Sequence, residues 1–247
     1  MQVLVAGGKF RVLDEFRITG VFDHLARSCQ LALLTTLDQS ESGDTLPPEI
    51  RVTELSIRPA LVRLTRLLRE SGAWAYRRRS VSFRTRAITG NLFGGLDIPF
   101  GASFTSTASR FFRAGRRSRK RKNLRKTALV VLFGSPLIHF LLRQCCIILA
   151  SREVRKDSSL RILVASSDVV VICFENFSAF DLAVLVACRM EARRSLLIPL
   201  NWDNITSKCV LPVKPDCVAV FGPRIRSQAS FIHKIPEDRI HVLGSAR

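Results

Sequence analysis

The chain has 247 residues, of which 47% are hydrophobic and 24% are charged. This composition excludes wholesale disorder, and the length allows one large domain or two small ones. The 39 Lys and Arg exceed the 20 Asp and Glu, which gives a formal net charge of +19. Residues 63–126 hold 18 basic residues and two acids, which accounts for +16, so the rest carries about +3.

The first residues predict a buried strand rather than a secretory signal. The apolar run 3–6 meets Gly7, Gly8 and Lys9, and it is shorter than a signal's apolar region of ~7 to 15 residues. The seven cysteines form no CxxC pair, and several lie in apolar runs. Reduced thiols and a cytoplasmic location are therefore expected.

The first elements along the chain predict a βαβ unit. A strand at 2–6 is followed by a helix at about 19–28, with Val21, Phe22 and Leu25 on one face, and by a second strand at 31–35. Such units favour a parallel sheet whose strands carry ligand-binding groups at their carboxyl ends.

The middle of the chain has a different character. Residues 56–70 predict an amphipathic helix, with Leu61 and Leu64 on its apolar side, and Gly72 is expected to end it. Residues 73–126 are rich in Arg, Ser, Gly and Phe and lack a sustained period. They predict a basic, largely helical or irregular insertion.

The apolar segment at 127–150 predicts a helix that is buried or lies on a membrane surface, with a membrane span as the second alternative. Arg143 interrupts it before it reaches the ~20 apolar residues that a span needs. The preceding basic run suits an anionic membrane surface or a solvated loop about equally. Nucleic acid ranks third, because no recognition motif accompanies the charge.

The second half repeats the strand–helix alternation. Strands are expected at 168–174, 195–200, 217–221 and 239–243, with helices at about 178–190 and 223–233. Ser178 and Asp181 have the spacing of a capping box, which begins the first of these helices. The chain is therefore predicted to be an α/β protein with a Rossmann-like parallel sheet and flanking helices.

The motif Trp202-Asp-Asn-Ile-Thr-Ser-Lys208 directly follows a predicted strand. Its hydroxyl, amide and ammonium groups suit a sugar or a phosphate, and Trp202 is able to stack on a sugar face. The alternative is an Asx-type turn in which Trp202 fills the core and Lys208 is solvated. The sequence has no phosphate-binding P-loop, no D-x-D pair and no zinc or serine-hydrolase motif, so no metal site is expected.

This motif, with Leu211-Pro, Pro215-Asp, the strand ending at Gly222 and residues 233–240, resembles glycosyltransferases of the GT-B type. The resemblance is to enzymes of bacterial surface-carbohydrate synthesis, whose architecture is related to CDP-glycerol glycerophosphotransferases and UDP-N-acetylglucosamine 2-epimerases. It covers 168–247 and, more weakly, 2–37. The sequence departs from the family at Cys209, where a small residue is usual, and at Ala246, where Pro is common.

The resemblance implies a single amino-terminal domain at 1–238, with the basic insertion at 73–126 and the apolar helix at 127–150. Residues 239–247 would begin a second domain, which the sequence does not contain. The nucleotide-activated sugar donor is expected on that missing domain, and no cofactor is expected on this half. The partner would be a carbohydrate or lipid-linked acceptor, and the location cytoplasmic or peripheral on the inner face of the plasma membrane.

The family pattern places the substrate contacts on loops that follow strands. They are Gly7, Gly8, Asn176, Trp202, Asp203, Asn204, Ser207 and Lys208, and Glu175 is the candidate catalytic base toward an acceptor hydroxyl. Glu175 has the alternative role of capping the next helix. The function implied is metal-independent transfer of an activated sugar or glycerophosphate to a membrane-associated acceptor. The alternative is a non-catalytic peripheral membrane or anion-binding protein on a Rossmann-like scaffold.

Overall fold

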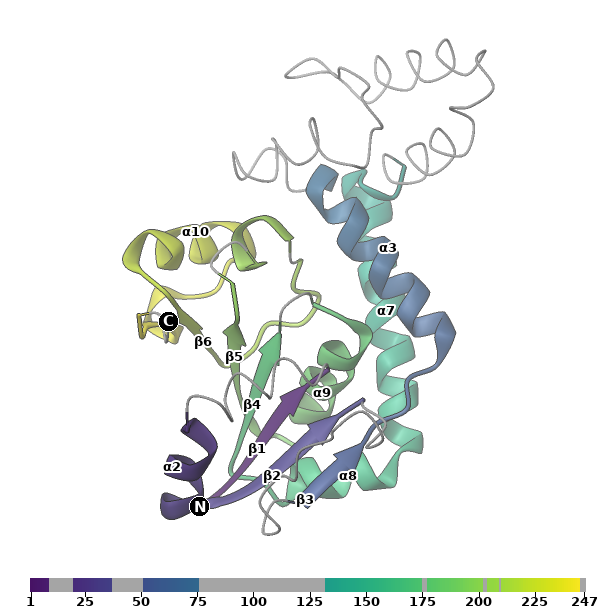
Figure 1. Cartoon of the computed structure of the whole chain (residues 1–247). Coiled ribbons are helices and arrows are strands. Elements are labelled where there is room, and N and C mark those ends of the chain that lie inside the picture. The colour runs from purple at the N-terminus through teal and green to yellow at the C-terminus, as the bar shows by residue number, and fades with distance from the viewer. Residues whose placement is uncertain are drawn as a thin grey trace, which may run out of the picture.

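The computed structural model describes residues 1–8, 20–36, 51–75, 132–174, 177–201, 204–208 and 210–244 (Figure 1). Most of the expected basic insertion therefore lies outside the described residues. Seven strands form one sheet: β1 (Gln2–Gly7), β2 (Gln30–Thr35), β3 (Arg51–Glu54), β4 (Val169–Phe174), β5 (Arg194–Pro199), β6 (Cys217–Val220) and β7 (Ile240–Val242). Their order is β3-β2-β1-β4-β5-β6-β7 and all neighbours are parallel, which confirms the predicted Rossmann-like α/β fold.

The central strands are buried on both faces, as parallel strands usually are. In β1, Leu4 and Ala6 belong to the larger apolar core on one face, whereas Val3 and Val5 belong to the smaller core on the other. This alternation follows from the two-residue period of a strand. It explains why the apolar run at 3–6 is continuous rather than amphipathic.

Helices cover both faces of the sheet. They are α2 (Val21–Ser28), α3 (Pro59–Ala75), α7 (Pro136–Lys156), α8 (Ser158–Ala165), α9 (Ala179–Met190) and α10 (Pro223–His233), with the π-helix η3 (Asn204–Lys208) and the 3-10 helix η4 (Glu237–Arg239). Residues 179–188 of α9 are all buried, because α9 lies between the sheet and the helices α3, α7 and α8. The pair α3 and α7 forms the outer layer (Figure 1).

One expected boundary needs correction. Gly72 does not end its helix, because α3 continues to Ala75. Residues 240–242 form β7, which pairs with β6 in the same sheet, so the sheet extends past the domain boundary expected at residue 238. The strand had been predicted from its local sequence, but the resemblance assigned it to another domain.

The apolar segment at 127–150 contains most of a helix, but α7 begins at Pro136 and continues to Lys156. Proline favours the first helical turn, where its missing N–H is not needed. The buried residues His139, Leu142, Cys146, Ala150 and Val154 recur every three or four positions and face α3 and α9. Across the described part of the chain, the length and apolar character of the helices fall short of what a membrane crossing requires.

Candidate functional site

At one point along the carboxyl edge of the sheet, the direction in which successive strands are added to the sheet reverses. From β1 the chain passes through α2 to β2 on one side, whereas β4 lies on the other side of β1. Ligands of open parallel sheets bind outside the carboxyl ends of the strands at such a switch point. The candidate site is therefore the end of β1 and β4, where α9 begins.

Gly8 lies at this point, directly after β1. The hydroxyl of Thr36, which follows β2, donates to the carbonyl oxygen of Gly8 at 2.7 Å and so joins the ends of the two strands. A Cβ atom at Gly8 would stand 3.2 Å from Cδ1 of Phe180 in the first turn of α9. The Phe180 ring is buried, so the missing side chain of Gly8 allows the close approach of the β1 end to α9.

The beginning of α9 is fixed by the capping box that the sequence predicts. The backbone N–H and the hydroxyl of Ser178 both donate to Oδ2 of Asp181 at 2.7 Å. The backbone N–H of Asp181 donates in return to Oγ of Ser178 at 3.4 Å. Together these bonds satisfy donors that the first turn of a helix leaves unpaired.

The sequence predicts Asp181 only as a helix-capping residue. The structure shows that it is also a buried titratable group. Its side chain is only 2% exposed, and Oδ1 has no hydrogen-bond partner among the described residues. Burial raises the pKa of Asp181 from 3.8 to about 7, against the opposing effect of the hydrogen bonds from Ser178. The flanking apolar residues 182–186 are the signal that would have indicated a buried carboxyl group.

The described part of the motif that follows β5 is buried at its first three residues, 204–206. Asn204, the first residue of η3, is fully buried, and its Nδ2 donates to the carbonyl oxygen of Phe174 at the end of β4 at 3.3 Å. Ile205 and Thr206 are also buried, and Nε2 of His233 in α10 lies 2.6 Å from the carbonyl oxygen of Ile205. Asn204 thus connects η3 to β4 rather than facing solvent.

The structure describes only some of the predicted substrate-contact residues. It places Gly7, Gly8 and Asn204 as given above. Ser207 and Lys208 belong to η3, but their side chains are outside the description. Glu175, Asn176, Trp202 and Asp203 lie outside the described residues. Their roles stay predictions.

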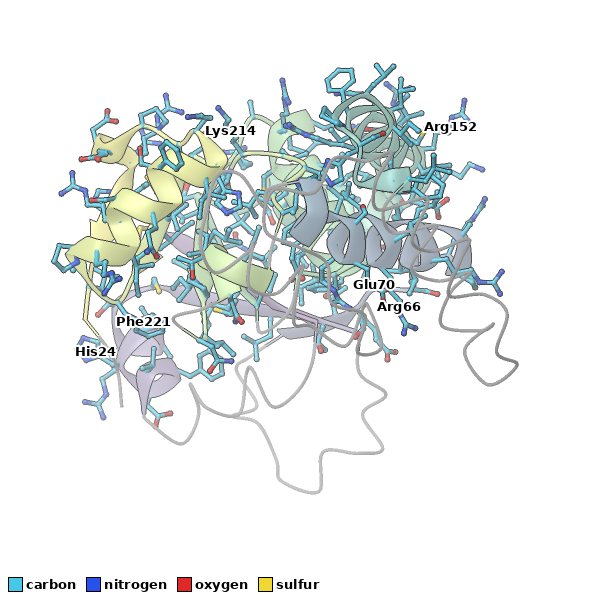
Figure 2. All side chains as sticks on the ribbon, turned by 90° about the horizontal axis from the view of Figure 1, so that it is seen from above. His24, Arg66, Glu70, Arg152, Lys214 and Phe221 are labelled. Atoms are coloured by element: carbon cyan, nitrogen blue, oxygen red, sulfur yellow. The ribbon has the colours of Figure 1, made fainter. Side chains whose placement is uncertain are left out.

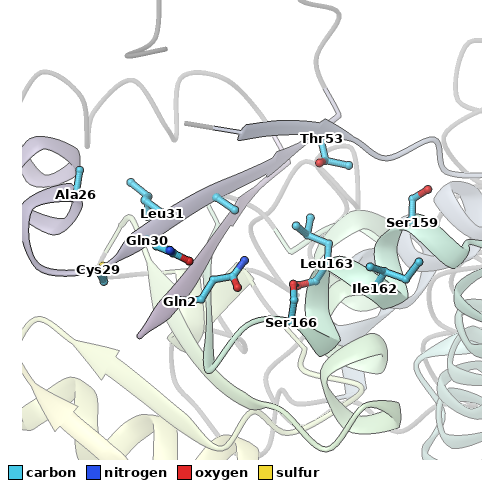
Figure 3. A pocket seen from close by; sticks show the side chains of 11 residues that line it. Gln2, Ala26, Cys29, Gln30, Leu31, Thr53, Ser159, Ile162, Leu163 and Ser166 are labelled. Atoms are coloured by element: carbon cyan, nitrogen blue, oxygen red, sulfur yellow. The ribbon is translucent and has the colours of Figure 1, made fainter. Parts of the chain in front are cut away.

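A pocket of about 730 Å³ lies at the other edge of the sheet (Figure 3). Its lining comes from the first residues of β1 and β2, from α2 and from α8, and it includes Gln2, Gln30, Ser159 and Ser166. Amides, hydroxyls, the Cys29 thiol and apolar groups line it, with no carboxylate, histidine or basic side chain among them.

The described residues contain no cluster of three or more His, Cys, Asp or Glu side chains suited to a metal ion. Comparison with known proteins identifies no relative: no family model, no curated protein and no solved structure matches the chain. Any functional assignment therefore has to come from the chain itself.

Proposed function

We propose that this chain is the acceptor-side domain of a GT-B-type glycosyltransferase. It binds a carbohydrate or lipid-linked acceptor at the carboxyl edge of the sheet, and the reaction transfers a nucleotide-activated sugar or glycerophosphate without a metal ion. The donor would be bound by a separate domain, which faces this edge. The resemblance of residues 168–247 to such enzymes motivates the proposal.

One structural observation supports this proposal. The predicted contact residues follow β1, β4 and β5, and these three strands are adjacent in the sheet. Because the strands are parallel, their carboxyl ends meet at one edge of the sheet. The proposal therefore rests on three strand ends that are up to about 200 residues apart in the sequence and adjacent in the sheet.

The chemistry proposed for this edge needs a base for the acceptor hydroxyl. Glu175 comes directly after β4 in the sequence, so it would take that proton while its neighbour Asn176 and the residues Trp202, Asp203, Ser207 and Lys208 hold the sugar. Asp181 serves as a positioning residue, because its carboxyl group holds Ser178 and the beginning of α9 beside Gly8.

The proposal is tested by the fluorescence of Trp202. The chain has two tryptophans, so the variant Trp74→Phe leaves Trp202 as the single reporter. Titration of this variant with soluble lipid-linked sugar phosphates is expected to give a saturable change in emission. Asp203→Ala and Lys208→Ala should weaken binding by about tenfold, which is the effect of losing one charge-assisted hydrogen bond.

Two controls separate binding from catalysis and from general damage. Glu175→Gln is expected to bind the acceptor with an unchanged affinity, because it removes only the base. Ser227→Ala, at an exposed position of α10, should also bind normally. Absence of a saturable signal with every acceptor, or an equal loss in Ser227→Ala, would refute the proposed function.

A peripheral membrane protein is the second candidate function, and the outer face of α7 favours it. Leu137, Phe140, Leu141 and Ile148 are each at least half exposed there. Flotation with vesicles tests it: Leu137→Ser with Leu141→Ser should abolish flotation if these side chains enter the lipid interface. The matched control is Val62→Ser in α3, because Val62 is exposed outside this face.

A further inference from the structure

A second pocket lies between α7, the end of α9 and the loop before β6. Its volume is about 610 Å³, which is within the range of about 300–1,000 Å³ of small-ligand sites. The lining includes Ser195 at the start of β5 and Asp216 directly before β6. The pocket therefore opens at the amino edge of the sheet, away from the edge at which we place the acceptor.

The pocket is lined by an excess of positive charge. Its charged residues are Arg143, Arg189, Arg193, Arg194, Lys214 and Asp216, so five cations face one carboxylate and the formal sum is +4. Within the described residues, none of the five cations forms an ion pair with a carboxylate. Like charges gathered in one hollow repel one another, and a bound anion relieves that repulsion.

The single carboxylate is already engaged. Oδ2 of Asp216 accepts the backbone N–H of Ser195 at 2.9 Å and the Ser195 hydroxyl at 2.7 Å. The Ser195 hydroxyl oxygen accepts the backbone N–H of Asp216 in turn, at 3.0 Å. Asp216 thus fixes the start of β5 against the start of β6, and it is not the partner of the surrounding arginines.

Two of the cations are held by a hydrogen bond to a backbone carbonyl oxygen, and a third has a buried nitrogen without a hydrogen-bond partner in the described part of the chain. Nε of Arg143 donates to the carbonyl oxygen of Pro212 at 2.7 Å, which leaves the terminal nitrogens of its guanidinium to a ligand. Nζ of Lys214 donates to the carbonyl oxygen of Lys234 at 2.6 Å, beside α10 at the molecular surface (Figure 2). Nε of Arg193 is buried without a hydrogen-bond partner among the described residues.

The carboxyl end of α9 lines part of the pocket, and a helix carboxyl end carries partial negative charge. Ala192 adopts a left-handed conformation with a φ of 51°. The backbone N–H groups of Glu191 and Arg193 then donate to the carbonyl oxygens of Ala187 and Cys188 at 2.9 and 2.8 Å. This Schellman-type ending provides a partner for the carbonyl oxygen of Cys188, one of the helix-end carbonyl groups that have no intrahelical partner.

We infer that this pocket, lined by Arg143, Arg189, Arg193, Arg194 and Lys214, is a binding site for a phosphate-bearing anion. Guanidinium groups bind phosphate oxygens with paired, charge-assisted hydrogen bonds, and four of the five cations are arginines. The phosphate belongs either to a free anion such as pyrophosphate or to a lipid headgroup. The site does not depend on the proposed glycosyltransferase function, because it lies at the other edge of the sheet.

Charge reversal of two exposed arginines of the pocket tests the site. The first experiment titrates inorganic pyrophosphate into the full chain by calorimetry, and the second floats the chain with phosphatidylcholine vesicles with and without phosphatidylglycerol. The pocket variant is Arg189→Glu with Arg194→Glu. The control is Arg224→Glu with Arg239→Glu, which makes the same change of charge at exposed positions of α10 and η4.

The pocket variant is expected to lower the affinity by tenfold or more in at least one experiment, with a change of less than about threefold in the control. Loss confined to pyrophosphate assigns the site to free phosphates, and loss confined to vesicles assigns it to lipid headgroups. Equal losses in the two variants, or no saturable binding by the wild-type chain in either experiment, would overturn the inference, because they indicate diffuse attraction or none.

Two further measurements keep the result interpretable. Arg189→Gln with Arg194→Gln removes the charges without reversing them, and it replaces the pocket variant if circular dichroism shows that the glutamates disturb the fold. The acceptor titration of the Trp74→Phe chain, repeated with the pocket substitutions, should be unchanged. A failure of the phosphate site and a failure of the proposed function are therefore told apart.

Discussion

Two features of the fold act in opposite directions on the pKa of the Asp181 carboxyl group. It accepts two hydrogen bonds from Ser178, which favour its ionised form, but its burial disfavours that form more strongly. The result is a carboxyl group with a pKa of about 7 beside the candidate acceptor site. A group of this kind connects the stability of α9 to pH.

We expect Asp181 to reduce the stability of the chain as the pH rises from about 4 to about 7. In that interval the unfolded carboxyl group loses its proton and the folded one keeps it, so ionisation favours the unfolded state. Above about pH 7 the folded group ionises as well, and the loss levels off. The slope is at most about 1.4 kcal/mol per pH unit.

Urea unfolding of the wild-type chain and of Asp181→Asn, from pH 4 to 8, measures this effect. The asparagine keeps an acceptor for Ser178 but does not titrate. The free energy of unfolding of the wild type, minus that of Asp181→Asn, should fall across the interval and then become constant. A difference that is constant from pH 4 to 7 would show that Asp181 has its ordinary pKa in the folded chain, and a rising difference would show that its pKa is lowered; either contradicts the prediction.

Gly72 is a second residue whose surroundings decide its role. In the interior of a helix, Gly→Ala ordinarily stabilises by about 1 kcal/mol. A Cβ atom at Gly72, however, would overlap the side chain of Val210, which is buried against α3. We therefore expect Gly72→Ala to destabilise the chain by about 1–3 kcal/mol, the usual cost of overpacking.

A double-mutant cycle with Val210→Ala separates the two contributions at Gly72. If the overlap is the cause, Gly72→Ala should cost much less in the Val210→Ala background, because the added methyl group then has space. Chemical denaturation of the four chains provides the free energies. A stabilising effect of Gly72→Ala in the wild-type background would contradict the proposed contact.

These residues show which features of the candidate site could be predicted from the sequence and which could not. The Ser178–Asp181 capping box was predicted and is confirmed, because its two partners are three positions apart and form bonds with each other. The burial of Asn204 was not predicted, since it depends on the end of β4, thirty positions earlier, and on α10. Gly72 was expected to end its helix because glycine is a poor helix former, and its contact with Val210, which is remote in sequence, was not predicted.

At the scale of elements, Asp157 separates two consecutive helices. It is the C-cap residue of α7 and the N-cap residue of α8. Its N–H donates to the carbonyl oxygens of Glu153 and Val154 at the end of α7, and its Oδ1 accepts the N–H of Leu160 in α8 at 2.9 Å. One residue thus ends a helix of 21 residues and begins one of 8. The chain turns there so that α8 reaches the sheet edge below α9.

Asp157→Ala is expected to destabilise the chain by about 1 kcal/mol, because the N–H of Leu160 loses its acceptor. Asp157→Asn retains an acceptor oxygen and should cost only a few tenths of a kcal/mol. Urea unfolding of both variants compares them directly. Equal losses in the two variants would mean that the charge of Asp157, and not its capping bond, supports α8.

The predicted elements agree with the structure where their residues carry a local pattern. The strands β1, β4 and β5 and the helix α10 were predicted within one or two residues, because each is a run of apolar or periodic residues with a clear end. The edge strand β3 and the helix α8 were not predicted. β3 has only four residues, two of them charged, and its position is set by pairing with β2.

At the scale of the whole molecule, the larger apolar core joins the sheet to its helices, and few of the described thiols are accessible. Six described cysteines are free, and of these Cys145 is exposed whereas Cys146, Cys173 and Cys188 are buried. Burial raises the pKa of Cys146 to about 12 and that of Cys188 to about 12, and it raises the pKa of Cys173 further. The buried thiols are therefore both inaccessible and protonated at neutral pH.

Alkylation with N-ethylmaleimide is expected to modify Cys145 rapidly in the native chain and the three buried thiols only when the fold opens. The adjacent thiols of Cys145 and Cys146 form a matched pair, because they differ in burial but share the same helix. For a stability of 5 kcal/mol or more, the buried thiols should react at least about 5,000-fold more slowly. Mass spectrometry of peptides, with Cys145→Ser as the reference, gives the separate rates.

The three buried thiols lie in α7, β4 and α9, so their rates also test whether the described elements open together. One shared rate, which rises with urea at the slope of global unfolding, is the expected outcome because the larger core joins α7 and α9 to the sheet. A faster rate at Cys146 alone would instead show that the outer layer of α3 and α7 detaches first. In that case the proposed phosphate-binding pocket, which is lined by Arg143 of α7 and Arg189 of α9, would open with this layer. Bound pyrophosphate should then slow the labelling of Cys146 but not that of Cys145.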